Sequence, residues 1–398
     1  MIEVVGIGAA GWDSLGAAER ALVLAADRVL GGARHLELLP EVPDQERVTW
    51  PQDLRGALPG LVADHRERRL VVLASGDPLL AGVGATLLEL FGPTAVRVHP
   101  AVSSAALAAA RMGWPAQSYV VLRLRGGDVD LVRRELYDGR RLLVLSRDAG
   151  TPAEVARLLV EDGYGMSTLT VLGDLGAPQE SRAEALARSW SGPAPDLHVL
   201  CVQCVAGPAA AGGTLAPGLP DEAFDHDGQL TKRDLRASAL AHLLPRPGEL
   251  LWDVGAGAGS VAIEWMRAHP SCRAVAVEQQ EPRVKRIRAN ASRLGVPGLR
   301  TVLGVAPAAL TGLPAPDAVF VGGGATEPTL QQVWTALRPG GRLVVHAVTQ
   351  ETEMLLAGRW RQHGGELTRI AVEHLEPIGG FSGWKPARAV VQWSAVRP

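Results

Sequence analysis

Short apolar runs recur along the chain, and most are followed by a stretch in which apolar residues have helical spacing. Runs of this length predict buried strands. In the first half they lie at residues 3–7, 27–30, 70–74, 96–100, 120–123, 141–145, 169–172 and 197–205. Helices are expected between them, including one at 15–26 with Ser14 as its N-cap and one at 152–161. Strands that alternate with helices indicate an α/β fold.

The second half repeats this alternation. Strands are predicted at residues 250–254, 274–277, 301–303, 317–321, 342–347, 368–375 and 389–393. Helices are predicted at 231–244, with Thr231 as N-cap, and at 260–266, 282–294, 328–337 and 350–363. Seven strands, with the last expected to run antiparallel, predict a seven-stranded Rossmann-like sheet.

The composition changes between the two halves. Residues 205–214 carry no periodicity, and residues 215–220 add two prolines and a glycine, which is typical of a linker. The sequence therefore predicts a first domain at 1–207, a linker at 208–222 and a second domain at 223–398. A chain of 398 residues is long enough for two domains with separate cores.

A glycine turn follows the strand at 250–254. Gly255, Gly257 and Gly259 alternate with Ala256 and Ala258, and a helix pattern begins directly afterwards. Glycines permit tight turns and a close approach of the backbone to a ligand. Glu278 ends the next strand, where a carboxylate can accept hydrogen bonds from a ribose diol.

The spacing of this turn, with Asp253 before it, resembles the S-adenosylmethionine (SAM) site of class I methyltransferases. Two alternatives remain: a site for a nicotinamide or flavin nucleotide, and a tight turn that binds nothing.

Three turns at strand ends in the first half are rich in small and hydroxyl residues. The segments Val5–Gly8, Leu73–Pro78 and His99–Ala105, with 173–176 and 179–180 further on, resemble the tetrapyrrole methylase family, and specifically its corrin C-5 branch. The resemblance implies a two-part α/β domain that binds SAM in a cleft between its halves. The residues that it places in this cleft are Gly8, Gly76, Asp77, Ser103 and Ser104. Each could instead be a turn or cap residue, and Ser103 is the clearest case because a helix follows it.

The second half resembles the decarboxylating corrin C-15 methyltransferases through residues 228–233, 321–324 and 376–386. Residues 376–386 look too irregular for a strand and too apolar for an ordinary loop. The order of the two halves matches a family in which the C-5 and C-15 enzymes are fused. That match implies a bifunctional enzyme of cobalamin biosynthesis, which would methylate precorrin-6B at C-5 and C-15 and decarboxylate its C-12 acetate, giving precorrin-8X.

The same resemblance implies a role for each residue of the second SAM site. Thr231 would close over the amino-acid end of SAM, the turn Gly255–Gly259 would hold the methionyl part, Glu278 the ribose and Ala306 the adenine. Many class I enzymes have an acid where Val305 stands, so the adenine amine would have to bond to backbone or water here.

A tetrapyrrole ring with many carboxylates is expected to bind to basic residues. Lys232, Arg233 and Arg236 are the candidates, although they could also form a solvated helix face. The candidates for other contacts to the ring are Gly323, Phe381 and Trp384, and the two aromatic residues could instead pack in the core. A general acid could protonate the carbon left by decarboxylation. His346 and Glu327 are candidates, and the alternatives are a satisfied core histidine and a surface acid.

Composition narrows the class of protein. A net charge of −2 argues against a general nucleic-acid binder. Cys201 and Cys204 lie on opposite faces of one predicted strand, so we expect two core thiols and no metal site. The chain starts directly in a strand, and no apolar run has the length of a membrane span, so a cytoplasmic location is expected. The resemblance also implies that the chain forms a homo-oligomer. The alternatives are a class I methyltransferase acting on another small molecule or on nucleic acid, a nucleotide-dependent reductase, and a SAM-binding protein without activity.

Overall fold

The computed structural model describes residues 1–63, 66–124, 127–208, 210 and 213–398. The chain forms two compact units, one of Met1–Val129 with Tyr137–Ala211 and one of Asp130–Leu136 with Gly212–Pro398. The short segment Asp130–Leu136, which the sequence placed in the first domain, thus belongs to the second unit. Of the predicted linker, Ala209, Ala211 and Gly212 lie outside the described residues.

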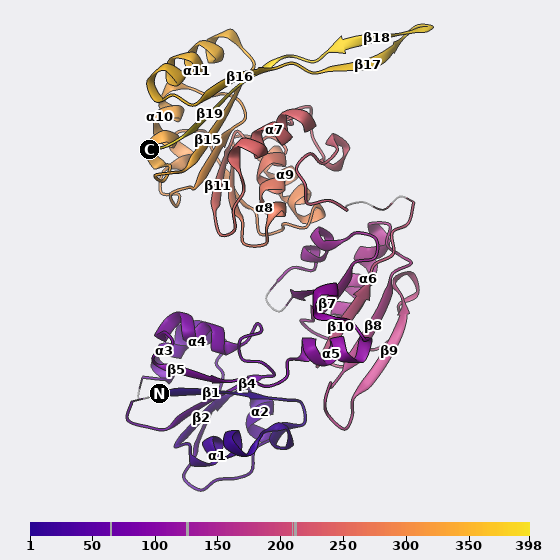
Figure 1. Cartoon of the computed structure of the whole chain (residues 1–398), viewed down its shortest axis with the longest axis vertical. Coiled ribbons are helices and arrows are strands. Elements are labelled where there is room, and N and C mark those ends of the chain that lie inside the picture. Colours follow the sequence, from indigo (N-terminus) through magenta and orange to yellow (C-terminus); the bar gives the residue numbers. More distant parts are fainter. Residues whose placement is uncertain (64–65, 125–126, 209, 211–212) are drawn as a thin grey trace. The chain divides into compact units, whose positions relative to one another are not determined.

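The first unit begins with a parallel sheet of five strands in the order β3-β2-β4-β1-β5. Its strands are β1 (Ile2–Ile7), β2 (Arg28–Gly31), β3 (Glu46–Thr49), β4 (Leu70–Ser75) and β5 (Val96–His99). One face is covered by α1 (Ala17–Ala25) and α2 (Ala33–Glu37), the other by α3 (Leu54–Leu61) and α4 (Val83–Phe91), as Figure 1 shows. The central strands β1, β2 and β4 are mostly apolar because both of their faces are buried.

A second, mixed sheet completes this unit, in the order β6-β7-β10-β8-β9. Its elements are α5 (Ser104–Met112), β6 (Val120–Arg123), β7 (Arg141–Leu145), α6 (Thr151–Glu161), β8 (Thr168–Gly173), β9 (Ser181–Leu186) and β10 (His198–Gln203). Cys201 and Cys204 are buried free thiols, and burial raises the pKa of each to about 12. Both thiols therefore stay protonated and unreactive at neutral pH.

The second unit is built on a seven-stranded sheet in the order β13-β12-β11-β14-β15-β19-β16. Its strands are β11 (Leu250–Val254), β12 (Arg273–Glu278), β13 (Arg300–Leu303), β14 (Ala318–Val321), β15 (Arg342–Ala347), β16 (Glu366–Ile370) and β19 (Val390–Val396). The last strand, β19, runs antiparallel to both of its neighbours, which confirms the predicted sheet.

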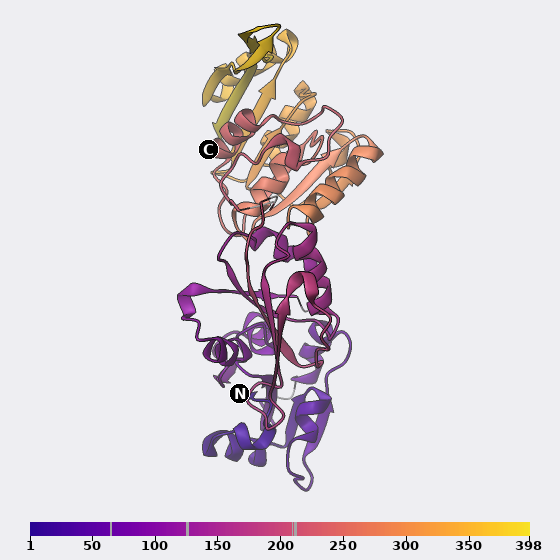
Figure 2. The same ribbon diagram turned by 90° about the vertical axis from the view of Figure 1, so that its right-hand side faces the viewer.

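Helices cover both faces of this sheet (Figures 1 and 2). One face packs against α7 (Arg233–Leu243), α8 (Ser260–Ala268) and α9 (Glu281–Arg293), and the other against α10 (Glu327–Ala336) and α11 (Gln350–His363). No helix within the described ranges combines the length and the apolar character that crossing a membrane requires.

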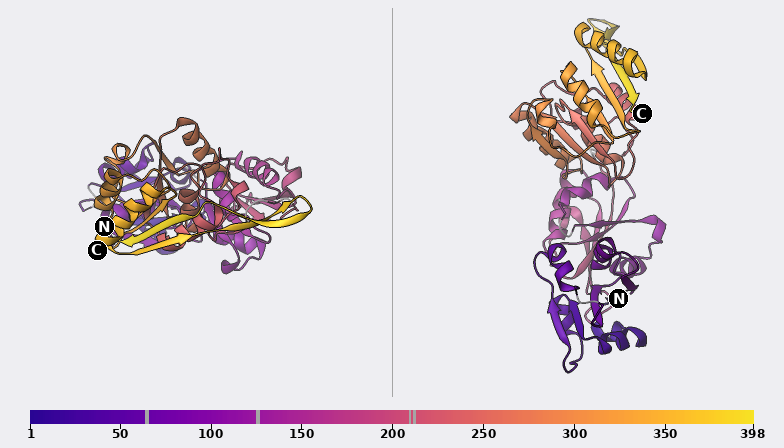
Figure 3. Two further views of the ribbon diagram at one scale, coloured as in Figure 1. Left: turned by 90° about the horizontal axis from the view of Figure 1, so that it is seen from above. Right: turned by 90° about the vertical axis from the view of Figure 1, so that its left-hand side faces the viewer.

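Residues 376–386 form most of a hairpin, so the expectation of an irregular segment was wrong. Strands β17 (Glu373–Ile378) and β18 (Phe381–Pro386) pair in antiparallel register and extend away from the sheet of the second unit (Figures 1 and 3). The prolines and glycines of the segment argue against a central strand. A two-stranded ribbon has only edge strands, which tolerate these residues.

Two predicted N-caps have other roles. Ser14 lies in a 3₁₀ turn, Gly11–Ser14, and its Oγ accepts a hydrogen bond from the Gly8 amide at 2.9 Å. The first helix starts after Gly16 instead. Lys232, not Thr231, occupies the N-cap position of α7. Strands β3 and β9 were missed because they expose much of their surface and so show no apolar run.

The predicted linker also extends too far. The backbone amides of Gly218 and Leu219 donate to the carboxylate of Glu264 at 2.6 and 3.0 Å. Glu264 is buried on α8, so the chain is fixed to the second unit several residues before the predicted end of the linker at 222.

Candidate active site

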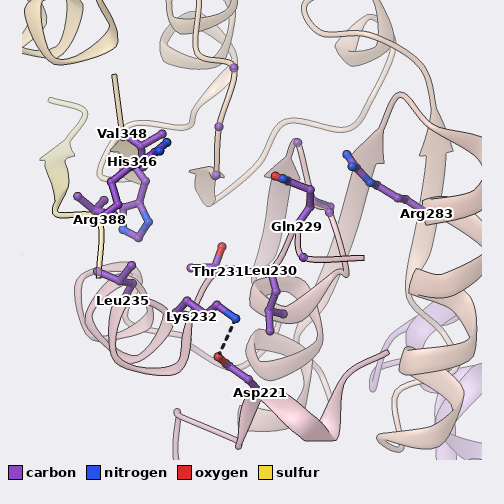
Figure 4. A pocket seen from close by; sticks show the side chains of 18 of the residues that line it. Asp221, Gln229, Leu230, Thr231, Lys232, Leu235, Arg283, His346, Val348 and Arg388 are labelled. Atoms are coloured by element: carbon purple, nitrogen blue, oxygen red, sulfur yellow. Dashed lines mark ion pairs between the residues drawn. The ribbon is translucent and has the colours of Figure 1, made fainter. Parts of the chain in front are cut away.

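A cavity of about 1270 Å³ opens at the carboxyl ends of the parallel strands of the second unit. Its walls include the ends of β11, β12, β14 and β15, the glycine turn, and the loop 228–232. In open α/β sheets, ligands bind outside the carboxyl ends of the strands. Figure 4 shows two ends: His346, Val348 and Arg388 lie on one side, Gln229 and Arg283 on the other, with Leu230, Thr231 and Lys232 between them.

The glycine turn needs its glycines for two reasons. Gly255, Gly257 and Gly259 have φ angles of 70°, 59° and 77°, which side chains disfavour. A Cβ on Gly257 would also lie 2.7 Å from the Gln229 carbonyl oxygen, and one on Gly259 would lie 2.8 Å from Ile287 Cγ2. The absence of side chains thus lets the loop 228–232 pass directly over the turn.

Glu278 is buried at the end of β12 and faces this turn. Its Oε2 accepts from the Gly257 amide at 2.9 Å, and its Oε1 accepts from the Gln280 amide at 3.1 Å. Each carboxylate oxygen can accept a second hydrogen bond. Glu278 lines the cavity, as Ala306 and Val305 do on the next strand end. The carboxylate is thereby fixed in position and keeps acceptor capacity for a ligand diol.

Asp253, on β11, fixes the start of the helix α8 that follows the glycine turn. Its Oδ2 accepts from the Ala262 amide in the first turn of α8 at 3.0 Å, while its buried Oδ1 has no partner among the described residues. Burial raises the pKa of Asp253 to about 7, and the charge of Glu278 acts in the same direction. Sequence reasoning identified Asp253 only as part of the turn motif, without this role.

His346 stands on β15 at the opposite end of the cavity and is 4 % exposed. Its Nε2 lies 3.0 Å from Gln392 Oε1, and its ring meets the edge of Phe320 at 5.0 Å between centroids. Burial lowers the pKa of His346, so the ring is neutral at pH 7. His346 is thus the candidate general acid that lines the cavity.

The other candidate, Glu327, does not line it. Glu327 begins α10, and its Oε1 accepts from the buried Arg359 guanidinium at 2.5 Å. Phe381 and Trp384 lie on the hairpin, 85 % and 66 % exposed, and neither packs in the core nor lines the cavity. Gly323 does line it, with open space where a Cβ would be.

Three cationic side chains line the cavity without a buried partner. Lys232 Nζ lies 3.4 Å from Asp221 Oδ2 (Figure 4), whereas Arg233 and Arg388 have no hydrogen-bond or ion-pair partner in the described part of the chain. Arg388 was missed because it follows the hairpin in a segment without periodicity.

Arg236 does not belong to this set, contrary to the expectation from sequence. Its side chain is fully buried, Nε donates to Glu264 at 2.6 Å, and Phe224 lies under the guanidinium at 4.7 Å. Arg236 also donates to the carbonyl of Thr231. The guanidinium donor nitrogens of Arg236 are all used to fix the start of α7, so they are not available to a ligand.

In the first unit, three predicted turns converge at the carboxyl ends of β4, β1 and β5, which are neighbours in the sheet. A Cβ on Gly6 would lie 2.3 Å from the Gly76 carbonyl oxygen, and one on Gly76 would lie 3.3 Å from Ser103 Cα. Asp77 Oδ1 accepts from the Leu79 amide, and Ser103 Oγ caps α5 through the Ala106 amide. The structure thus brings together the turns that carry Gly8, Gly76, Asp77, Ser103 and Ser104, and Ser103 does serve as a helix cap.

Comparison with known proteins assigns a family to each half. Residues 1–189 match the tetrapyrrole (corrin/porphyrin) methylases, and residues 222–397 match a precorrin methyltransferase domain. A precorrin-6Y C(5,15)-methyltransferase [decarboxylating] from Sinorhizobium sp is 44 % identical over 395 residues, which cover 99 % of this chain and 95 % of that protein. The chain belongs to the decarboxylating precorrin-6Y C(5,15)-methyltransferases.

Two further family members illustrate the extent of the match. The protein of the same name from Mycobacterium tuberculosis (strain ATCC 25618 / H37Rv) is 42 % identical over 402 residues, covering the whole of both chains. The solved C-terminal domain of the Rhodobacter capsulatus protein is 46 % identical and covers 46 % of this chain and all of that one, with a TM-score of 0.45. As a member of this family the chain is a methyltransferase, and the alternatives of a reductase or an inactive SAM-binding protein are not supported.

Proposed function

We propose that each unit binds one SAM and that both act on the same precorrin: the first unit methylates C-5, and the second methylates C-15 and removes a carboxyl group as CO₂. One observation carries this proposal for the second unit. A single cavity joins the glycine turn and Glu278 to His346 and to the cations Lys232, Arg233 and Arg388. The precorrin-6B substrate, the C-12 acetate and the precorrin-8X product follow from the resemblance described above.

The second unit fits SAM through groups that are already in place. The turn Gly255–Gly259 offers backbone at close range, and Glu278 has acceptor capacity for a ribose diol. Ala306 lines the wall where the adenine would lie, and Thr231 lines the cavity from within the loop that crosses the turn. Bound SAM supplies a methyl group already activated on a sulfonium. The protein then has to hold carbon, methyl and sulfur in line, and such positioning can supply roughly 7–11 kcal/mol.

The substrate would occupy the opposite end of the cavity. A precorrin carries many carboxylates, and an arginine fork binds a carboxylate through two parallel hydrogen bonds. Arg233 and Arg388 have no partner among the described residues, and Lys232 has a single half-buried one, Asp221. Gly323 leaves room for the ring because nothing stands where its Cβ would be. We therefore assign Arg233, Arg388 and Lys232 to the carboxylates, and we withdraw Arg236.

The first unit would bind its own SAM at the converging turns. Gly8, Gly76 and Asp77 follow adjacent strands, and Ser103 and Ser104 start the helix that leads into the second sheet. The close packing at Gly6 and Gly76 supports a built site, because no residue with a side chain could replace either glycine without moving backbone.

We further infer that the chain forms a homo-oligomer in the cytoplasm. The hairpin β17–β18 exposes Leu375, Ile378, Phe381 and Trp384, between 57 % and 85 % each, and both of its edges are unpaired with the rest of the described strands. Such a surface favours pairing with another copy. Light scattering should give a smaller assembly for Phe381→Ser/Trp384→Ser than for the wild type. An unchanged mass would remove the hairpin from the interface.

The cofactor proposal is tested by titrating SAM into the full chain in a calorimeter. We expect two sites per chain in the wild type and one in Glu278→Ala. Glu281→Ala is the matched control, because Glu281 is exposed on α9 and pairs with Lys285 instead of facing the cavity. A wild-type chain with a single site, or an E278A chain that keeps both, would contradict the proposal.

A further inference from the structure

A chain of polar side chains runs from His346 away from the cavity through the sheet. Gln392, on the neighbouring strand β19, places Oε1 3.0 Å from His346 Nε2. The same oxygen accepts from the Ser238 hydroxyl on α7 at 3.2 Å, and Gln392 Nε2 lies 3.1 Å from His242 Nδ1. His242 Nε2 in turn lies 3.5 Å from Glu366 Oε2 on β16.

This arrangement determines what His346 presents to a ligand. A carbonyl oxygen can only accept, so the amide orientation with Gln392 Oε1 toward the ring places the proton of His346 on Nε2. Nδ1 then holds a lone pair. Nδ1 has no hydrogen-bond partner among the described residues. It is also not one of their polar atoms that lack both a partner and solvent access. Because His346 lines the cavity, this lone pair is available to a ligand there.

The two reactions of the second unit have complementary proton requirements. In methyl transfer a carbon–methyl bond forms, the sulfur keeps the electron pair of the broken bond, and the methylated carbon releases a proton. In decarboxylation the carbon–carbon bond breaks, CO₂ leaves, and the electron pair remains on carbon, which takes up a proton. The pair of steps balances if one group accepts the first proton and donates the second.

We propose that His346 Nδ1 is this group and that Gln392 is the positioning residue that keeps Nδ1 free. The inference rests on the proposed function. His346 starts neutral and takes the proton from the methylated carbon. It becomes an imidazolium whose Nε2–H remains bonded to Gln392, and it returns the proton to the carbon that has lost CO₂. Burial lowers the pKa of His346 and so makes this imidazolium a stronger acid than an exposed one.

The charged groups around His346 are consistent with this cycle. His242 faces it across Gln392 from α7, and Glu366 faces His242 from β16. Arg388 and Arg233 line the same cavity and disfavour a permanent positive charge on the ring. None of these groups replaces the Nε2–H bond to Gln392, which leaves the amide as the determinant of the tautomer.

The first test uses the full chain with SAM and the precorrin, following methyl gain at the second site and CO₂ release. His346→Asn should lower both rates by about 100-fold or more, the usual range for a lost acid–base group. It should leave methylation by the first unit and SAM binding unchanged. His363→Asn is the matched control, since His363 packs against Trp334 outside the cavity. If H346N keeps both rates within a few-fold of wild type, the inference is overturned. A wild type that neither methylates nor decarboxylates would instead overturn the proposed function.

The second test separates positioning from packing. Gln392→Glu keeps an acceptor for Nε2–H but adds negative charge beside the ring, which raises the pKa of His346. The acid limb of the rate–pH profile should move upward by about one pH unit or more. Gln331→Glu, the same change on α10 beside Arg359, should leave it in place. An unmoved acid limb in Q392E would remove Gln392 from the mechanism.

A third measurement follows the proton itself. A substrate with deuterium on the carbon that the second unit methylates should, in one turnover in ordinary water, deliver deuterium to the carbon that loses CO₂. Complete loss of the label to water would overturn the direct transfer by His346.

Discussion

Replacing Gly257 with alanine tests the geometry of the second cofactor site most sharply. Gly257 has a φ of 59°, and its amide donates to Glu278 Oε2 at 2.9 Å. An added Cβ would lie 2.7 Å from the Gln229 carbonyl oxygen, closer than such atoms can approach. The loop 228–232 must move or the turn must open, and either change separates groups that together form one end of the cavity.

Two contributions to the effect can be distinguished. A left-handed backbone costs a residue with a side chain about 1–2 kcal/mol, which lowers the free energy of unfolding of the second unit. Displacement of the loop additionally weakens SAM binding there. We expect an increase in Kd of at least about tenfold, which corresponds to about 1.4 kcal/mol.

Gly312→Ala provides the control. Gly312 has a φ of 76°, but a Cβ added to it would meet no atom within 4 Å, and it does not line the cavity. G312A should show the backbone cost in chemical denaturation and no loss of SAM affinity in calorimetry. If G257A binds SAM at the second site as tightly as G312A does, the glycine turn is not the cofactor site.

Three further predictions concern other parts of the molecule. Burial raises the pKa of Asp253 from 3.8 to about 7, so the folded state binds this proton more tightly and the free energy of unfolding should fall as pH rises from about 4 to 7. Asp253→Asn removes this pH dependence and should be more stable than the wild type at pH 8 by at most about 4 kcal/mol. Denaturant titrations that give the same difference at pH 4 and at pH 8 would refute the assignment. Arg236→Met leaves Glu264 as an unpaired buried charge and should cost about 3–5 kcal/mol in the unfolding of the second unit; a loss below about 1 kcal/mol would contradict the contacts described. Gly76→Ala should disrupt the first unit alone, so that mass spectrometry finds a product with one methyl gained and CO₂ lost; two methyl groups gained would exclude Gly76 from the first site.

Much of the fold could be predicted because its strands are buried on both faces. Strands such as β11 and β15 appear as mostly apolar runs, and their predicted bounds agree with the structure. Edge strands such as β3 are exposed and lack this signal. The hairpin was missed for a related reason, since its residues pack against no core.

The cofactor end of the cavity was more predictable than the substrate end. Gly257 and Glu278 are tied to strand ends, so their positions follow from the alternation of strands and helices. The roles of Lys232, Arg236 and Arg388 depend on which guanidinium or ammonium group finds a buried partner, and that is decided by tertiary packing. Arg236 looked identical to Arg233 in the sequence, but the carboxylate of Glu264 is 28 positions away along the chain.

The central claim is that two different methyltransferase units in one chain act on the same ring. It is tested most directly by the mass of the product formed when the full chain is incubated with SAM and precorrin-6B. The account predicts a product with two methyl groups gained and one CO₂ lost. A product that has gained only one methyl group, or that has kept every carboxyl group, would contradict it.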